Sequence, residues 1–125
     1  MPSQSEMKAV LQRYIDGFNA EDPRAIAELF ADDATVEDPV GSEPIRGREA
    51  IAEFYREAVA TGAKLTLETP VRGSQADYAA MAFSIDLEYE GQPTRIRAID
   101  VMRIDESGRI ASMQAFWGPE DVEPR

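Results

Sequence analysis

The sequence predicts an α+β fold, with helices in the first half of the chain and an antiparallel sheet in the second. Two observations predict this class. Apolar residues recur every three or four positions up to about residue 61, and every second position from about residue 64 onward. Helices that precede a run of strands cover one face of a curved sheet. No repeat, linker or low-complexity segment interrupts the 125 residues, and we expect one domain spanning 1–125.

Three helices are expected in the first half. Ser3 and Glu6 have the spacing of a capping box, and the helix that they begin extends to about Asn19. Asp22 and Pro23 predict the start of a short second helix, since Asp is favoured at the N-cap and Pro in the first turn. A third helix is expected over about 48–61. Each helix has one apolar stripe. In chain order the stripes are Met7, Val10, Leu11, Tyr14, Ile15 and Phe18 in the first helix, Ile26, Leu29 and Phe30 in the second, and Ile51, Phe54, Tyr55, Ala58 and Val59 in the third.

Strands are expected over residues 34–38, 64–72, 78–89, 96–104 and 109–117. Residues 39–47 are rich in Pro and Gly and predict a loop. Pro70 predicts an edge strand or a bulge, because proline cannot donate to a central ladder. The polar, proline-containing tail 118–125 is expected to be frayed.

Composition excludes several kinds of chemistry. The chain has no cysteine and no histidine, so thiol nucleophiles and Ser-His-Asp catalysis are excluded and acid–base work falls to carboxylates, tyrosines or lysines. A net charge of −11 argues against nucleic acid and anionic membranes as partners. The acidic run around residues 32–38 matches no metal-binding loop, and we expect no metal. Without a signal-peptide segment or a membrane span, a cytoplasmic protein is the simplest expectation.

Asp100 is the most informative residue, because it occupies an apolar row. Its strand alternates, so that Asp100 shares a face with Ile96, Ala98, Met102 and Ile104. Burying an ionised, unpaired carboxylate is costly, and such a group usually stays protonated. A neutral acid can donate a hydrogen bond to an oxyanion. The alternative is a strand edge where this carboxylate reaches water or an arginine.

Three further residues join Asp100 as candidates. Tyr14 and Tyr55 lie on the buried stripes of the first and third helices, and a buried phenol needs a hydrogen-bond partner. Asp38, at the end of the first strand, is expected at the rim of the same interior. Each also has a plain structural explanation, as a core tyrosine bonded to a backbone carbonyl or as a turn aspartate before proline. Together they predict a small polar cluster in an apolar cavity.

Five segments carry a resemblance to a known family: residues 12–14, 31–44, 54–55, 99–103 and 113–117. Through them nearly the whole chain resembles the bacterial ketosteroid isomerases, or steroid Δ-isomerases, of the nuclear transport factor 2-like superfamily. The resemblance implies a cone-shaped α+β fold, with three N-terminal helices packed on a curved, mostly antiparallel sheet. It also implies a homodimer that needs no cofactor. The acidic run is more specific than the fold, which hosts many unrelated activities.

The resemblance assigns roles residue by residue. Asp38 corresponds to the general base, Tyr14 and Asp100 to two oxyanion donors, and Tyr55 to the tyrosine that hydrogen-bonds the first donor. A neutral aspartic acid as donor is a known feature of this family. Phe30 stands where some relatives carry a further tyrosine, so a shorter hydrogen-bond network is expected. The apolar pocket positions that match are Phe54, Met81, Phe83, Met113 and Trp117.

The activity implied is the movement of the double bond of a 3-oxo-Δ5-steroid to the conjugated Δ4 position, by proton abstraction, dienolate stabilisation and reprotonation. Two alternatives remain open. One is an epoxide hydrolase or polyketide-type cyclase on the same fold. Hydrolases of this kind use an Asp-Arg-Asp arrangement around water, whereas Arg97 and Arg103 are expected on the strand face opposite Asp100. The other is a non-catalytic binder of apolar ligands.

Overall fold

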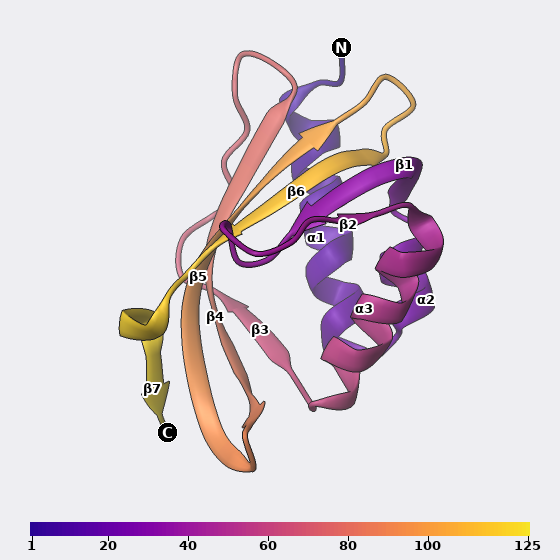
Figure 1. Cartoon of the computed structure of the whole chain (residues 1–125). Coiled ribbons are helices and arrows are strands. Elements are labelled where there is room, and N and C mark those ends of the chain that lie inside the picture. The colour runs from indigo at the N-terminus through magenta and orange to yellow at the C-terminus, as the bar shows by residue number, and fades with distance from the viewer.

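Three α-helices cover one face of a curved, seven-stranded sheet in the computed structural model, which describes all 125 residues (Figure 1). This arrangement confirms the expected α+β class with three N-terminal helices on a mostly antiparallel sheet. None of the helices has the length and apolar character needed to span a membrane. The elements are α1 (Gln4–Asn19), α2 (Pro23–Ala27), β1 (Phe30–Glu37), β2 (Ile45–Arg46), α3 (Arg48–Ala60), β3 (Lys64–Leu67), β4 (Tyr78–Tyr89), β5 (Gln92–Ile104), β6 (Ile110–Phe116), a 3₁₀ turn η1 (Pro119–Asp121) and β7 (Val122–Pro124).

The helices begin where the capping residues predict. The Ser3 hydroxyl accepts a hydrogen bond from the Glu6 amide at 3.0 Å, and the Glu6 carboxylate accepts one from the Ser3 amide at 2.9 Å. Asp22 caps α2 by accepting from the Ala25 amide at 3.1 Å. These bonds satisfy amide groups that a helix start leaves without partners. Gly47 precedes α3 with φ +87°, a conformation that favours glycine.

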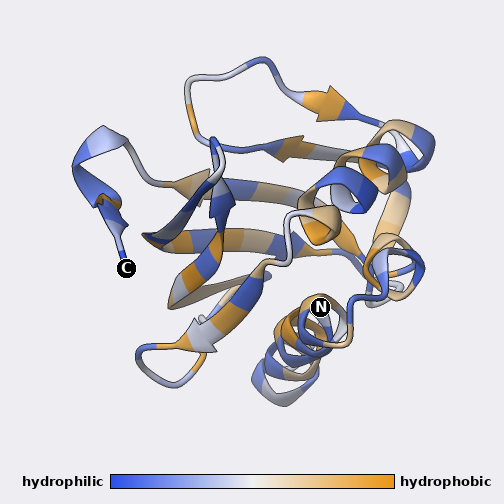
Figure 2. Cartoon of the chain, turned by 90° about the horizontal axis from the view of Figure 1, so that it is seen from below, coloured by the Kyte–Doolittle hydropathy of each residue, from blue (hydrophilic) through white to orange (hydrophobic).

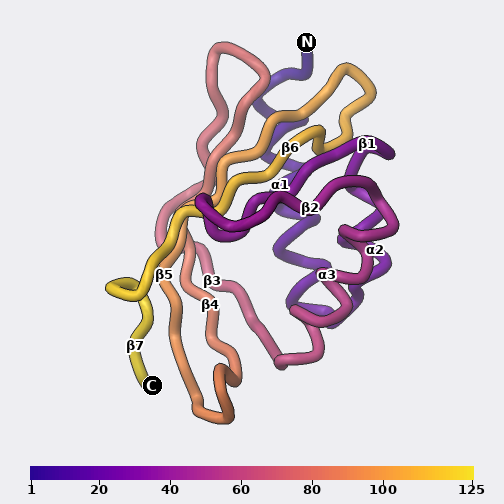
Figure 3. Tube along the Cα trace, in the orientation of Figure 1, coloured from indigo at the N-terminus to yellow at the C-terminus, as the bar shows by residue number.

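The sheet has the strand order β2-β1-β6-β5-β4-β3, which can be followed along the trace in Figure 3. The pairs β3–β4, β4–β5 and β5–β6 are antiparallel, whereas β1 pairs with β6 in parallel. Glu37 at the end of β1 is level with Gln114 of β6. This parallel pairing brings the residues that follow β1 next to the end of β6.

Three strands differ by several residues from their expectation, and one of them is β5, which starts at Gln92 instead of residue 96. β1 starts at Phe30 instead of residue 34, and the carbonyl of Leu29 already accepts a hydrogen bond from the Ile110 amide at 2.8 Å. β3 ends at Leu67, and pairing resumes only at a bridge between Arg72 and Ala80. The interruption contains Pro70 and lies in the edge strand of the sheet, as proline requires.

The core lies between the helices and the inner face of the sheet. Hydrophobic and hydrophilic residues alternate along the strands in Figure 2. On β5 the inner residues Ile96, Ala98, Met102 and Ile104 are at most 6% exposed, whereas Ile99 on the outer face is 47% exposed. The alternation read from the sequence therefore gives the correct inner face of this strand.

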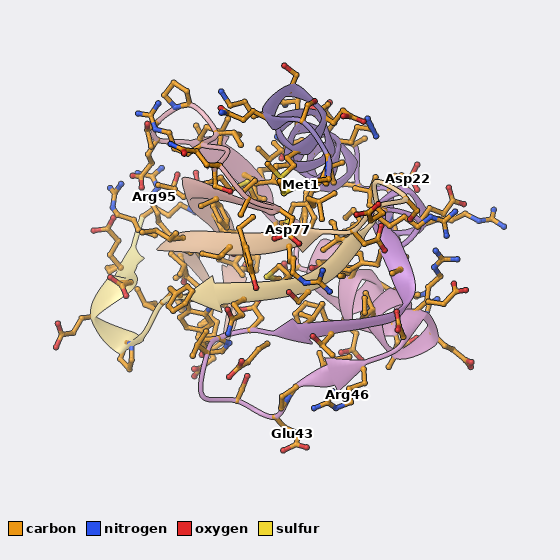
Figure 4. The ribbon with its side chains drawn as sticks, turned by 90° about the horizontal axis from the view of Figure 1, so that it is seen from above. Met1, Asp22, Glu43, Arg46, Asp77 and Arg95 are labelled. Atoms are coloured by element: carbon orange, nitrogen blue, oxygen red, sulfur yellow. The ribbon has the colours of Figure 1, made fainter.

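The C-terminal tail is ordered, and the expectation that residues 118–125 are frayed is wrong. β7 pairs antiparallel with residues 94–96 of β5. The Arg125 guanidinium donates to the carbonyls of Thr94 at 2.9 Å and Leu87 at 3.1 Å. β5 pairs with β6 only from Ile99 onward, so the first half of β5 has free backbone groups on that side, and the tail satisfies them. Figure 4 shows Arg95 on the side of the sheet where β7 lies, and Glu43 and Arg46 at the far edge, where β2 is the last strand.

Removing residues 122–125 is expected to lower the free energy of unfolding by about 1–2 kcal/mol. Several hydrogen bonds are lost, each worth about 0.5–1.5 kcal/mol net, and the ordering entropy of the tail offsets part of that loss. Urea unfolding of the full chain and of a chain that ends at Asp121 measures the difference. Arg125→Ala is the matched control, because it keeps β7 and removes only the side-chain bonds. An unchanged urea midpoint in the truncated chain would show that β7 contributes nothing to stability.

Candidate active site

A largely apolar cavity of about 200 Å³ lies between the helices and the inner face of the sheet. Thirteen of its sixteen lining residues are hydrophobic, and the other three are Asp38, Thr61 and Asp100. A mostly apolar pocket with a few converging polar groups is the usual form of a site for a small organic molecule. The hydrophobic lining residues are Tyr14, Phe18, Phe54, Ala58, Ala63, Leu65, Phe83, Ile85, Leu87, Ile96, Ala98, Ala115 and Trp117.

Asp100 is buried in the position that the strand pattern predicts. It is 2% exposed, and its Oδ1 atom has no hydrogen-bond partner in the protein. Burial raises the pKa of Asp100 well above the ordinary value for an aspartic acid, and the nearby charge of Asp38 raises it further. Burial therefore favours the protonated, neutral form of Asp100. A buried polar atom without a partner is uncommon, and here it borders a cavity where a ligand could supply that partner.

Asp100 lies at the floor of the cavity, at the point along β5 where the packed core ends and the cavity begins. In one direction along β5, Met102 and Ile104 are completely buried in the core. In the other direction, Ala98 and Ile96 line the cavity. Ala98 and the strand neighbour of Asp100 on β6, Ala115, have small side chains. These small residues leave room for a flat molecule next to the carboxyl group.

Two tyrosine hydroxyls form a buried hydrogen bond beside this floor. The hydroxyl oxygens of Tyr14 on α1 and Tyr55 on α3 are 2.9 Å apart, and either can donate. Tyr14 lines the cavity, and Tyr55 lies behind it with no exposed surface. Burial raises the pKa of both phenols well above its ordinary value, so both stay protonated at neutral pH. The Phe30 ring lies 5.5 Å from that of Tyr55, so the hydroxyl network ends after two members, as expected.

Asp38 follows β1 and lies at the side of the cavity. The indole Nε1–H of Trp117 donates a hydrogen bond to Asp38 Oδ1 at 2.8 Å, across 79 residues of sequence. Burial raises the pKa of Asp38, and the bond from Trp117 opposes this rise by stabilising the carboxylate. The negative charge of Asp38 in turn raises the pKa of Asp100 and of Tyr14. The two aspartates thus have different environments, because Asp38 has a hydrogen-bond donor that opposes the effect of burial and the Oδ1 atom of Asp100 has no partner.

Most of the predicted site residues line the cavity, but two methionines do not. Phe54, Phe83 and Trp117 are among the lining residues, whereas Met81 and Met113 are each 1% exposed and lie in the core. Met81 pairs with Asp100 at the level of the floor, and Met113 pairs with Met102 one step deeper. Sequence periodicity places Met81 and Phe83 on the same apolar face of their strand, but it gives no depth along the strand.

Several lining residues were not predicted as site residues. Ile85, Leu87 and Ile96 continue the inner rows of β4 and β5 beyond Asp100, and the strand period alone would have found them. Thr61 continues the stripe of Phe54 and Ala58 on α3. No group of three or more acidic side chains is placed to hold a metal ion. Of the acidic run, Asp32 forms an ion pair with Arg48 at 3.1 Å.

Comparisons with known proteins agree with this geometry. The family described as SnoaL-like domain matches residues 11–113. A steroid Delta-isomerase of Nocardioides simplex is 43% identical over 118 residues, which are 94% of each chain. The epoxide hydrolase LasB of Streptomyces lasalocidi is 28% identical over 97% of this chain, which spans 44% of that protein. A solved structure of SalBIII, an epoxide hydrolase/cyclase-like enzyme in pyran ring formation in polyether salinomycin, has a TM-score of 0.91 at 28% identity and covers 97% of each chain.

The fold is thus that of a SnoaL-like protein in the nuclear transport factor 2-like superfamily. The 43% identity to the steroid Delta-isomerase, over nearly the full length of both chains, refines this class. The chain belongs to the bacterial ketosteroid isomerase family, and the resemblance seen in the sequence is confirmed.

The raised pKa of Asp100 predicts a measurable pH dependence of stability. Above the unfolded pKa of about 3.9, the unfolded chain loses a proton that the folded protein keeps until its higher pKa is reached. The free energy of unfolding therefore falls as pH rises through this window, by up to about 1.4 kcal/mol per pH unit. Asp100→Asn abolishes this contribution. Urea unfolding of both proteins from about pH 4 upward should show wild type losing stability relative to the variant. A constant difference across the window would contradict the raised pKa.

Proposed function

We propose that the chain is a cofactor-independent steroid Δ-isomerase that converts 3-oxo-Δ5-steroids to the conjugated Δ4 ketones. One observation carries this proposal: the buried, neutral carboxyl of Asp100 borders the same apolar cavity as the Tyr14 hydroxyl and the Asp38 carboxylate. The activity named for the Nocardioides simplex relative supports it. The substrate class also suits the lining, since a steroid is flat, apolar and uncharged.

The first step is the transfer of a proton from carbon 4 of the steroid to Asp38. The carbon–hydrogen bond breaks, an O–H bond forms on the carboxylate, and the electron pair moves toward the ketone oxygen. Burial makes Asp38 more basic than an exposed aspartate, and the Trp117 bond fixes one of its oxygens, leaving the other to take the proton. Asp38 must be ionised to act, so turnover should be lost as pH falls below its pKa.

The negative charge of the dienolate collects on the ketone oxygen at the cavity floor. Tyr14 and neutral Asp100 donate hydrogen bonds to this oxygen, in a site where few water molecules compete. Either hydroxyl of the Tyr14–Tyr55 pair can donate, and the mechanism assigns the donor role to Tyr55, which leaves the Tyr14 proton for the substrate. Asp38 then returns its proton to carbon 6, and the double bond moves into conjugation. One base suffices because the proton leaves and returns on the same face of the steroid.

Asp38→Asn is expected to lower turnover by about 10²–10⁴-fold, the range for losing a positioned base. The assay follows growth of the conjugated-enone ultraviolet absorbance from 5-androstene-3,17-dione. Asp33→Asn is the control, because Asp33 is an exposed acid on β1, the strand that Asp38 follows. Near-normal turnover in Asp38→Asn would refute the assignment of the base. Absence of enone formation by the wild-type protein would refute the function.

A second candidate function is hydrolysis or cyclisation of an epoxide, because LasB and SalBIII are 28% identical to this chain. The geometry favours the isomerase, since no arginine lines the cavity. Arg97 pairs with Glu68 and Glu123, and Arg103 pairs with Asp77. Diol formation from an epoxide, without enone formation from the steroid, would favour the hydrolase. A third possibility, a non-catalytic binder, would take up steroids and form neither product.

We also propose that the protein is a homodimer that pairs through the outer face of the sheet. Ile99 and Phe116 are paired across β5 and β6, and both point away from the cavity. They are 47% and 46% exposed, and Val40 nearby is 40% exposed. Apolar side chains that are grouped on one face of a sheet favour contact with another protein surface. An identical patch on a second copy is self-complementary across a two-fold axis.

Sedimentation velocity at micromolar concentration tests this pairing, and the wild-type protein is expected to sediment as a dimer. Ile99→Glu places a charge in the middle of the patch and should shift the protein to the monomer. Tyr89→Glu is the matched control, since Tyr89 is also an exposed hydrophobic residue, 38% exposed, but lies at the tip of the β4–β5 hairpin. Wild-type protein that sediments only as a monomer would overturn the dimer.

A further inference from the structure

Thr61 is the one cavity residue with an aliphatic hydroxyl, and the reaction proposed above does not use it. It forms the C-cap of α3 and is partly exposed. The remaining non-hydrophobic lining residues are the two aspartates of the reaction. A hydroxyl at this place therefore needs an explanation, either as a local helix-end residue or as a contact for the ligand.

Thr61 lies at the end of the cavity opposite the reacting groups. Phe54, Ala58 and Thr61 form one stripe of α3 along the cavity wall, and the Phe54 ring packs 5.0 Å from Tyr55 near the floor. Seven helical residues extend about 10 Å, so Thr61 lies about that distance from Phe54 along the axis of α3. The opposite wall of the cavity is β4, whose last lining residue is Leu87. The next residue, Glu88, donates a hydrogen bond from its amide to the Thr61 carbonyl at 3.3 Å.

The hydrogen-bonding state of Thr61 limits what it can recognise. Its hydroxyl donates to the Ala58 carbonyl at 2.6 Å and has no other partner in the protein. A hydroxyl has one proton to donate and two lone pairs that accept. Since the proton is already used, Thr61 offers only acceptor capacity to a ligand.

We propose that Thr61 determines specificity for the steroid end remote from the ketone, by accepting a hydrogen bond from a hydroxyl group at carbon 17. With the ketone held by Tyr14 and Asp100, the four fused rings extend along the α3 stripe and bring carbon 17 to Thr61. A 17-hydroxyl supplies the proton that this oxygen lacks. A 17-oxo group would place one acceptor against another. The inference rests on the proposed isomerase function and extends it to the choice of substrate.

The test compares two substrates that differ only at carbon 17, 17β-hydroxy-5-androsten-3-one and 5-androstene-3,17-dione. We expect Thr61→Val to lower the ratio of kcat/KM for the hydroxy substrate over the oxo substrate by about fivefold, the usual worth of one hydrogen bond. The change should lie mainly in KM, because a remote contact is the same in the ground state and the transition state. Thr61→Ser keeps the hydroxyl and should keep the ratio. Thr66→Val is the control at an exposed threonine on β3.

The outcomes separate this inference from the proposed function. An unchanged ratio in Thr61→Val, or an equal loss on both substrates, overturns the role of Thr61 while the isomerase stands. Loss of the ratio in Thr61→Ser as well would point to packing and also overturn it. If wild-type protein forms no enone from either substrate, the isomerase itself is wrong. Competitive inhibition by the two Δ4 products gives the same ratio from binding alone, independently of turnover.

Discussion

The burial of one carboxyl group on β5 is the constraint on which the rest of the site depends. Asp100 gives up its hydration without receiving a hydrogen bond at Oδ1 in return. Such a group is tolerated only where the surrounding structure holds it in place, and here the flanking strands β4 and β6 do so through the antiparallel ladder. The same desolvation that costs stability raises the pKa of Asp100 and so favours its protonated form. The cost of folding and the raised pKa have one physical origin.

The two tyrosines are also buried polar groups, but their hydroxyls have hydrogen-bond partners. Each phenol has the other as its partner, so the pair is satisfied before any ligand arrives. Aromatic rings pack around them, including Phe18 at 5.3 Å from Tyr14 and Phe30 at 5.5 Å from Tyr55, and hold both hydroxyls in one orientation. A satisfied donor and an unsatisfied acid therefore border one cavity. This combination suits the proposed reaction, in which a substrate oxygen gains negative charge.

Local patterns in the sequence predict the parts of the structure that short-range interactions decide. The capping box at Ser3, the helix start at Asp22 and the inner row of β5 all depend on residues a few positions apart. The bond from Trp117 to Asp38 depends on the parallel pairing of β1 with β6, and no local pattern encodes a partner 79 residues away. The ordered tail was missed for a similar reason, since its composition resembles that of a loop and only the free side of β5 makes it a strand. The family resemblance implied pocket positions for Met81 and Met113, whereas both side chains lie in the core next to the cavity.

The alternation of β5 has a consequence for how this chain can change over evolutionary time. Asp100 faces inward and its neighbour Ile99 faces outward, so adjacent positions serve two unrelated surfaces. Insertion or deletion of a single residue within the strand would exchange them, placing an acid on the outer sheet face and a branched aliphatic chain at the cavity floor. Length variation is thus better tolerated outside the strand, for example at the hairpin tip at Glu90 and Gly91, where the backbone already adopts positive φ angles. Descendants of this chain can lengthen that tip freely, whereas the spacing between the tip and the buried acid can change only in steps of two.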